Sequence, residues 1–99
     1  MKKVLAIGAS NSSKSINKTF ATYIANQVEN VDITVVEWDQ LELPLYSPDL
    51  EASSGIPQNA HNFKKMVEDS DAVVLSLAEH NGMPTAAFKN LWDWTCLLY

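Results

Sequence analysis

Residues 72–94 read AVVLSLAEHNGMPTAAFKNLWDW. The run Ala72–Leu77 is short and apolar, as expected of a strand buried in a sheet, and a polar loop and a helical pattern follow it. A strand, a loop and a helix in this order place the loop at the carboxyl edge of the sheet. Open α/β folds bind their ligands at that edge, so the loop 78–82 is a candidate site.

The chain opens with the same arrangement. Val4–Ile7 has the pattern of a buried strand, Gly8–Lys14 has the composition of a loop, and a helical pattern begins at Ser15. One face of this helix is apolar, because apolar residues recur at every fourth position: Ile16, Phe20, Ile24 and Val28. Val31–Trp38 alternates and is rich in β-branched residues, which predicts a second strand and with it a right-handed βαβ unit.

The middle of the chain consists of a long loop, Leu41–Pro57, called the excursion below, and a helix. Leu41–Pro57 contains three prolines, and loops of this length are usually functional or interfacial. Pro57 suits the first turn of the next helix, whose apolar face comprises Ala60, Phe63, Met66 and Val67. The last helix is expected to start at Pro84 and to carry apolar residues around much of its circumference, which predicts cover on more than one side.

Composition excludes several functional classes. Ninety-nine residues suit a single domain spanning 1–99. A net charge of −5 without a basic cluster disfavours nucleic acid, and no apolar stretch is long enough to cross a membrane. The lone Cys96 excludes an internal disulfide framework and predicts a reducing, cytoplasmic location.

The first loop is rich in hydroxyl groups. Ser10, Ser12 and Ser15 lie within six residues, and Asn17 follows on the first helical turn. Helix N-termini carry unpaired N–H groups that suit anions, so this loop could hold a phosphate. Serine also caps helices without binding anything. The glycines of a dinucleotide fingerprint and of a Walker loop are absent, so a mononucleotide fits better.

The second loop, Glu79-His80-Asn81-Gly82, combines polar side chains with a glycine that lets the backbone approach a flat ligand. Its backbone N–H groups could reach the ring atoms of a planar heterocycle. A plain tight turn before Pro84 explains the same composition. A metal site is disfavoured, because no further ligand stands at a suitable spacing.

Both loops resemble the NADPH-dependent FMN reductase family of flavodoxin-like proteins, which includes quinone, chromate and azo-dye reductases. The family opens with G-S-x-R-x-x-S-x-N, and residues 8–17 read GASNSSKSIN, so Ser15 and Asn17 take the places of its phosphate-binding residues. Residues 44–51, PLYSPDLE, match P-L-Y-x-x-D-x-E. Residues 78–94 align without gaps to P-E-Y-N-x-x-x-P-x-x-L-K-N-x-x-D-W. Ser12 stands where the family often has arginine, and Ala78 and His80 replace a proline and a tyrosine.

This resemblance implies an α/β, flavodoxin-like parallel sheet and an FMN-dependent oxidoreductase that takes a hydride from NADPH or NADH. Electrons would pass to a quinone, an azo compound, a metal ion or free flavin. No side chain is expected to react, and none to bind a resident metal. The implied cofactor-binding residues are Ser10, Ser12, Ser15, Ile16 and Asn17 in the first loop and Ala78, Glu79, His80, Asn81 and Gly82 in the second.

Family members are nearly twice this length. The chain supplies strands 1–3 of the order 2-1-3-4-5, so we expect a truncated domain whose third strand is an open, apolar edge. Such an edge favours pairing with another chain and predicts a homo-oligomer, an edge-paired or swapped dimer or possibly a tetramer. The alternative function is a non-catalytic half-domain that acts only by association.

Overall fold

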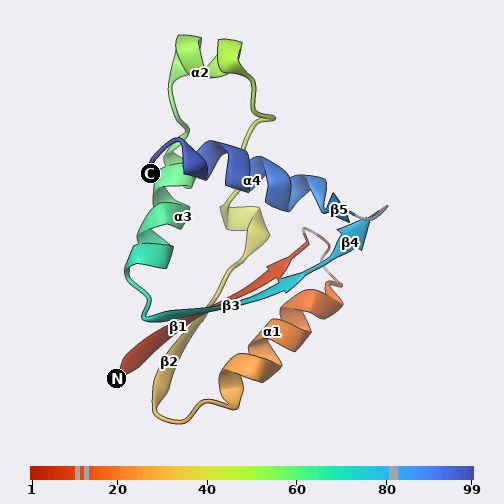
Figure 1. Ribbon diagram of the computed structural model, residues 1–99, viewed down its shortest axis with the longest axis vertical. Coiled ribbons are helices and arrows are strands. Elements are labelled where there is room, and N and C mark those ends of the chain that lie inside the picture. Colours follow the sequence, from red (N-terminus) through yellow and green to blue (C-terminus); the bar gives the residue numbers. More distant parts are fainter. Residues whose placement is uncertain (11, 13, 81–82) are drawn as a thin grey trace.

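The computed structural model describes residues 1–10, 12, 14–80 and 83–99. A parallel sheet with helices on both faces makes up the molecule, and the segment around α2 projects beyond it (Figure 1). The elements in chain order are β1 (Lys2–Ala9), α1 (Ile16–Asn26), β2 (Val31–Val35), the 3-10 turn η1 (Trp38–Gln40), α2 (Pro48–Ser54), α3 (Gln58–Glu68), β3 (Ala72–Leu77), β4 (Glu79–His80), β5 (Met83–Pro84) and α4 (Ala86–Cys96).

The sheet has the strand order β2-β1-β3, and both pairings are parallel. In the central strand β1, Leu5 lies opposite Thr34 of β2 and Val73 of β3. The side chains of β1 from Val4 onward are buried, as expected of a strand covered on both faces. This is the arrangement predicted for strands 1–3.

The two faces of the sheet are covered differently. Leu5 and Ile7 point to the side where α3 and α4 pack, and they join large side chains there: Val36, Leu41, Phe63 and Leu91. Val4 and Ala6 point to the other side, where α1 covers them with Ala21 and Ala25. One layer of the core is therefore built from large side chains and the other from small ones.

The apolar row predicted for α1 does not face the sheet. Ile16, Phe20 and Ile24 are exposed, while Ala21 and Ala25 are buried against β1. The reason is the close approach of α1 to the end of β1: a Cβ on Gly8 would lie 2.2 Å from the backbone nitrogen of Lys18. So close to the sheet, only small side chains fit beneath the helix.

Element boundaries also differ from the predictions. β2 ends at Val35 instead of Trp38, since the indole of Trp38 turns back to donate to the carbonyl oxygen of Gly8. The excursion contains a short helix, α2, capped by Ser47. The last helix begins at Ala86 because Thr85 is its N-cap. Across the residues described, every helix is too short or too polar to cross a bilayer.

Candidate functional site

The two predicted loops start side by side at the carboxyl edge of the sheet. Ala9, the last residue of β1, lies opposite Leu77, the last residue of β3. Ser10 and Ala78 therefore leave neighbouring parallel strands at the same level. The hydroxyl of Thr85 adds a second link, because it donates to the carbonyl oxygen of Ala9 at 2.7 Å. This pair of adjacent loops is the candidate site.

Three hydroxyls at the first loop, those of Ser10, Ser12 and Ser15, accept hydrogen bonds from the backbone. Ser10 Oγ accepts from the N–H of Ser12, and Ser12 Oγ accepts from the N–H of Lys14, both at 3.2 Å. Ser15 Oγ accepts from the N–H of Lys18 at 3.1 Å. Each hydroxyl keeps its own hydrogen to donate, because a serine oxygen can accept and donate at once.

Ser15 is the N-cap of α1, so the capping role considered from the sequence is real. The backbone N–H groups of Ile16 and Asn17 follow it, and they find no acceptor within the described residues. The side-chain oxygen of Asn17 accepts from Ser76 Oγ at 2.7 Å, which leaves the amide hydrogens of Asn17 for another acceptor. The head of α1 thus offers several donors and the positive end of the helix dipole.

The second loop is only partly described. Its flanks form a short antiparallel ladder in which Glu79 lies opposite Pro84 and His80 opposite Met83. Ala78 is half-buried where β3 ends. Asn81 and Gly82 lie outside the described residues. Thr85 was missed by sequence reasoning, although a threonine before a helical run is a recognisable N-cap signal, and it ties this loop to β1.

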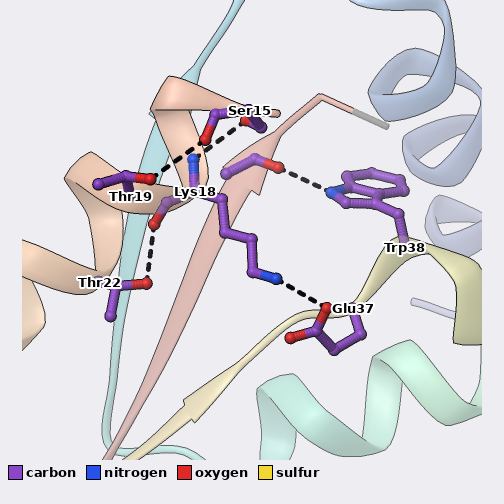
Figure 2. A network of polar contacts seen from close by, with 7 residues as sticks. Ser15, Lys18, Thr19, Thr22, Glu37 and Trp38 are labelled. Atoms are coloured by element: carbon purple, nitrogen blue, oxygen red, sulfur yellow. Dashed lines mark hydrogen bonds and ion pairs between the residues drawn. The ribbon is translucent and has the colours of Figure 1, made fainter. Parts of the chain in front are cut away.

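Lys18 and Glu37 form an ion pair beside the first loop. Lys18 Nζ lies 2.8 Å from Glu37 Oε2, and both side chains are about half exposed. Figure 2 shows the lysine side chain running from the head of α1 toward the segment after β2, away from Ser15. Trp38 Nε1 donates to Gly8 O at 2.7 Å in the same region. Sequence reasoning missed this pair, because the residues are far apart in the chain.

A well-defined hollow of the surface lies elsewhere. It has a volume of about 860 Å³ and is lined by the segment Trp38–Leu45 and by the first turns of α4. None of the candidate residues that the structure describes lines it. Ser15 and Ile16 instead border a shallower hollow of about 570 Å³ over the outer face of α1. In the ranges given above, no group of three or more His, Cys, Asp or Glu side chains is placed to hold a metal ion.

The base of the excursion is fixed to α4. Asn90 accepts from the backbone N–H of Tyr46 at 2.8 Å and donates to the carbonyl oxygen of Pro44 at 3.0 Å. Trp94 Nε1 donates to the same oxygen at 2.8 Å. The hydroxyl of Tyr46 donates to Glu51 at 2.9 Å. This hydrogen bond, together with partial burial, raises the pKa of Tyr46 above its usual value. The lining of the large hollow is therefore held in place.

Comparison with known proteins shows the family to which the chain is similar. Residues 2–97 match the family of NADPH-dependent FMN reductases. The chain is 30% identical over 92 residues to a 2-hydroxy-1,4-benzoquinone reductase of Burkholderia sp, covering 93% of this chain and 49% of that protein. It is 29% identical over 92 residues to the "Uncharacterized protein MG342 homolog" of Mycoplasma pneumoniae, covering 93% and 53%.

A solved structure with a similar fold is FerB, a flavoenzyme NAD(P)H:(acceptor) oxidoreductase from Paracoccus denitrificans. The match has a TM-score of 0.71 and 26% identity, and it covers 95% of this chain and 50% of FerB. The predicted fold class is confirmed: the sheet is flavodoxin-like, as in FerB. The chain spans about half the length of the relatives it matches.

Proposed function

The chain belongs to the NADPH-dependent FMN reductase family, and on that premise we propose that it is an FMN-dependent oxidoreductase. It takes NADPH or NADH as co-substrate and reduces a small-molecule acceptor such as a quinone. The observation that carries this proposal is the adjacency of the two loops, set by the register of Ala9 with Leu77 and by the bond from Thr85 to Ala9. The exposed free thiol of Cys96 suits a cytoplasmic location.

The head of α1 fits a phosphate group. The serine hydroxyls can donate while they accept from the backbone, and the N–H groups of Ile16 and Asn17 have no acceptor within the described residues. A phosphate accepts several hydrogen bonds and is stabilised by the helix dipole. Ser10, Ser12, Ser15 and Asn17 would therefore hold the phosphate of FMN, and the backbone at Ile16 would assist.

The second loop would hold the flavin ring. Ala78 leaves β3 at the same edge, and the segment from Glu79 to Gly82 would line the ring, largely through backbone groups. When bound, the flavin supplies the redox chemistry, accepting a hydride and passing electrons to the acceptor, while the protein places and orients it. No side chain of this chain needs to react.

Replacing Ser15 separates the capping role from phosphate binding. Aspartate caps a helix about as well as serine, so Ser15→Asp keeps α1 but sets a carboxylate against the phosphate. We expect thermal unfolding to stay unchanged and the affinity for FMN to fall by roughly ten- to hundredfold or more, the value of one charge-assisted hydrogen bond. Ser15→Ala should lower both the stability and the affinity.

The matched control is Ser47→Asp. Ser47 caps α2 by accepting from the N–H of Leu50 at 3.0 Å, as Ser15 caps α1, but it lies on the excursion. Affinity is measured by quenching of FMN fluorescence, and bound flavin by the yellow absorbance of the purified protein. An FMN affinity that Ser15→Asp leaves unchanged contradicts the phosphate site.

The rival function is a half-domain that folds and associates but does not hold flavin. The hydrogen bonds that Ser10, Ser12 and Ser15 accept from the backbone favour it, because they give these hydroxyls a structural role without a ligand. A colourless protein that does not quench FMN fluorescence, yet gives a cooperative unfolding transition, would decide for this rival.

A further inference from the structure

Strand β3 carries one polar side chain, Ser76, in the otherwise apolar run Ala72–Leu77. This side chain lies on the face that α1 covers, because side chains alternate along a strand and Val74, two residues earlier, packs into the layer beneath α1. The hydroxyl of Ser76 donates to the side-chain oxygen of Asn17 at 2.7 Å. A strand residue thus holds a side chain on the first turn of a helix that is 59 positions away in the chain.

The first turn of α1 is seated on two neighbouring strands (Figure 1). Gly8 of β1 lies opposite Ser76 of β3 in the parallel register, so the two positions lie on the same face of the sheet. A Cβ on Gly8 would lie 2.2 Å from the backbone nitrogen of Lys18, so the helix approaches this glycine closely. Asn17 precedes Lys18, and Ser76 holds it from the adjacent strand. One pair of strand residues therefore places both the backbone and a side chain of this turn.

The contact with Ser76 sets the orientation of the Asn17 amide. An amide has an oxygen that accepts hydrogen bonds and a nitrogen that donates two. Since the oxygen accepts from Ser76, the nitrogen keeps its hydrogens for another group. An ionised phosphate oxygen only accepts, so it needs donors at the head of α1. The opposite orientation of the amide would set an acceptor against the phosphate.

We propose that Ser76 is a positioning residue of the phosphate site: its hydroxyl holds the oxygen of Asn17, so that the amide nitrogen donates to the phosphate of FMN. This inference rests on the proposed function, because it needs a phosphate at the head of α1. Ser76 acts through Asn17 and makes no contact of its own with the phosphate. Without the hydroxyl, the part-buried oxygen loses this donor while the nitrogen binds the anion, and such an unpaired acceptor costs free energy. The cost falls on the bound state.

A purely structural role of Ser76 would have a different signature. If the hydrogen bond to Asn17 only fastened α1 to the sheet, its loss would lower stability and disturb the binding of every flavin alike. A role at the phosphate concerns only a flavin that carries one. Riboflavin has the ring system of FMN and lacks the phosphate, so the ratio of the two affinities isolates the phosphate site.

The experiment measures the affinities for FMN and riboflavin by quenching of flavin fluorescence. We expect the wild type to prefer FMN. Ser76→Ala should lower the FMN affinity about three- to tenfold, the value of one hydrogen bond, and leave the riboflavin affinity unchanged. Ser76→Cys offers only a weak donor and should repeat this loss, whereas Ser76→Thr keeps a hydroxyl and should restore the preference for FMN. Urea unfolding verifies that each variant is folded.

The matched control is Ser70→Ala. Ser70 lies just before β3, at the end of the strand opposite to Ser76, and its part-buried hydroxyl donates to the carbonyl oxygen of Met66 at 2.8 Å. The substitution also removes one part-buried hydrogen bond, so it should lower the free energy of unfolding by a similar amount. It should leave the preference for FMN unchanged, because Ser70 lies at the amino edge of the sheet.

A double-mutant cycle tests the route through Asn17. In an Asn17→Ala background, Ser76→Ala should have no further effect on FMN affinity. An equal loss in both backgrounds overturns the inference, and so does a Ser76→Ala variant whose preference for FMN over riboflavin matches that of the wild type. These two outcomes leave the proposed function standing. A wild type that binds neither flavin overturns both the inference and the proposed function.

Discussion

The two helix layers of the sheet differ in how closely they pack. On the side of α3 and α4, large side chains such as Phe63 and Leu91 fill the space against the sheet, and Trp94 is buried beneath the excursion. On the side of α1, Ala21 and Ala25 lie directly on β1, and Gly8 touches the first turn of the helix. The first layer buries more apolar surface, and the second brings a helix end close to a strand end.

The two layers should therefore contribute differently: one to the stability of the fold, the other to the position of the groups expected to bind the cofactor. Burial of large apolar side chains supplies most of the free energy of folding, so the α3/α4 layer should dominate stability. The α1 layer sets the distance between the hydroxyls at the head of α1 and the end of β1, so it should dominate cofactor binding. Four substitutions test this division.

Trp94→Ala should have the largest effect. Trp94 is fully buried, and its indole donates to the carbonyl oxygen of Pro44, so the substitution leaves a cavity and removes one of the two hydrogen bonds to that oxygen, the other coming from Asn90. We expect a loss of about 3–5 kcal/mol in the free energy of unfolding, measured by urea denaturation. Trp92, two residues away, is 56% exposed, and Trp92→Ala should cost under about 1 kcal/mol. Equal losses of stability in Trp94→Ala and Trp92→Ala would contradict the larger contribution expected of the buried Trp94.

Gly8→Ala should act on the α1 layer. The added methyl group would meet the backbone of Lys18 at 2.2 Å, so α1 must move away from β1. We expect a loss of about 1–3 kcal/mol in stability and a clear loss of FMN affinity by fluorescence quenching. Gly55 is the comparison: it has a φ of +74° and open space around it. Gly55→Ala should cost stability through strain alone and leave FMN affinity unchanged.

Glu37→Gln should have a smaller and opposite effect on binding. It breaks the half-exposed ion pair with Lys18, which is worth under about 1 kcal/mol in stability. It also frees a cation at the head of α1 and removes an anion near it, so the affinity for FMN should rise, most clearly at low salt. Glu68→Gln breaks a similar pair with Lys64 on α3 and should not change the affinity.

The smallest expected effect is on the pH dependence of stability, through Tyr46 in the excursion. The bond to Glu51 raises the pKa of Tyr46 above about 10. The neutral phenol is thus favoured by folding, and its contribution to stability is present below pH ~10 and lost as the pH rises through the raised pKa. Tyr46→Phe removes this contribution. The free energy by which the wild type is more stable than the variant should therefore become smaller as the pH rises from neutral to alkaline. Urea unfolding across that range measures this, and a constant difference would argue against it.

Periodicity was sufficient to predict the three strands of the parallel sheet, but not the short strands β4 and β5 or the packing of α1. The apolar row at Ile16, Phe20 and Ile24 is typical of a core-facing stripe, yet the alanines face the sheet. A periodic pattern tells which residues share a face, not which face is buried. The hydrogen bond of Thr85 to Ala9 and the ion pair of Lys18 with Glu37 were not predicted for a related reason: the two partners of each contact are distant in the chain.

The sequence by itself determined the three parallel strands, the polar loops after β1 and β3, and membership of a flavin reductase family, because these depend on local patterns and spaced motifs. Only the tertiary structure decided that the two loops adjoin through Ala9, Leu77 and Thr85. It also decided that α1 packs on the sheet through Ala21 and Ala25 and leaves its large apolar side chains exposed. The physical reason is the same in both cases: strand register and the close contact at Gly8 are long-range geometry, which no local pattern specifies.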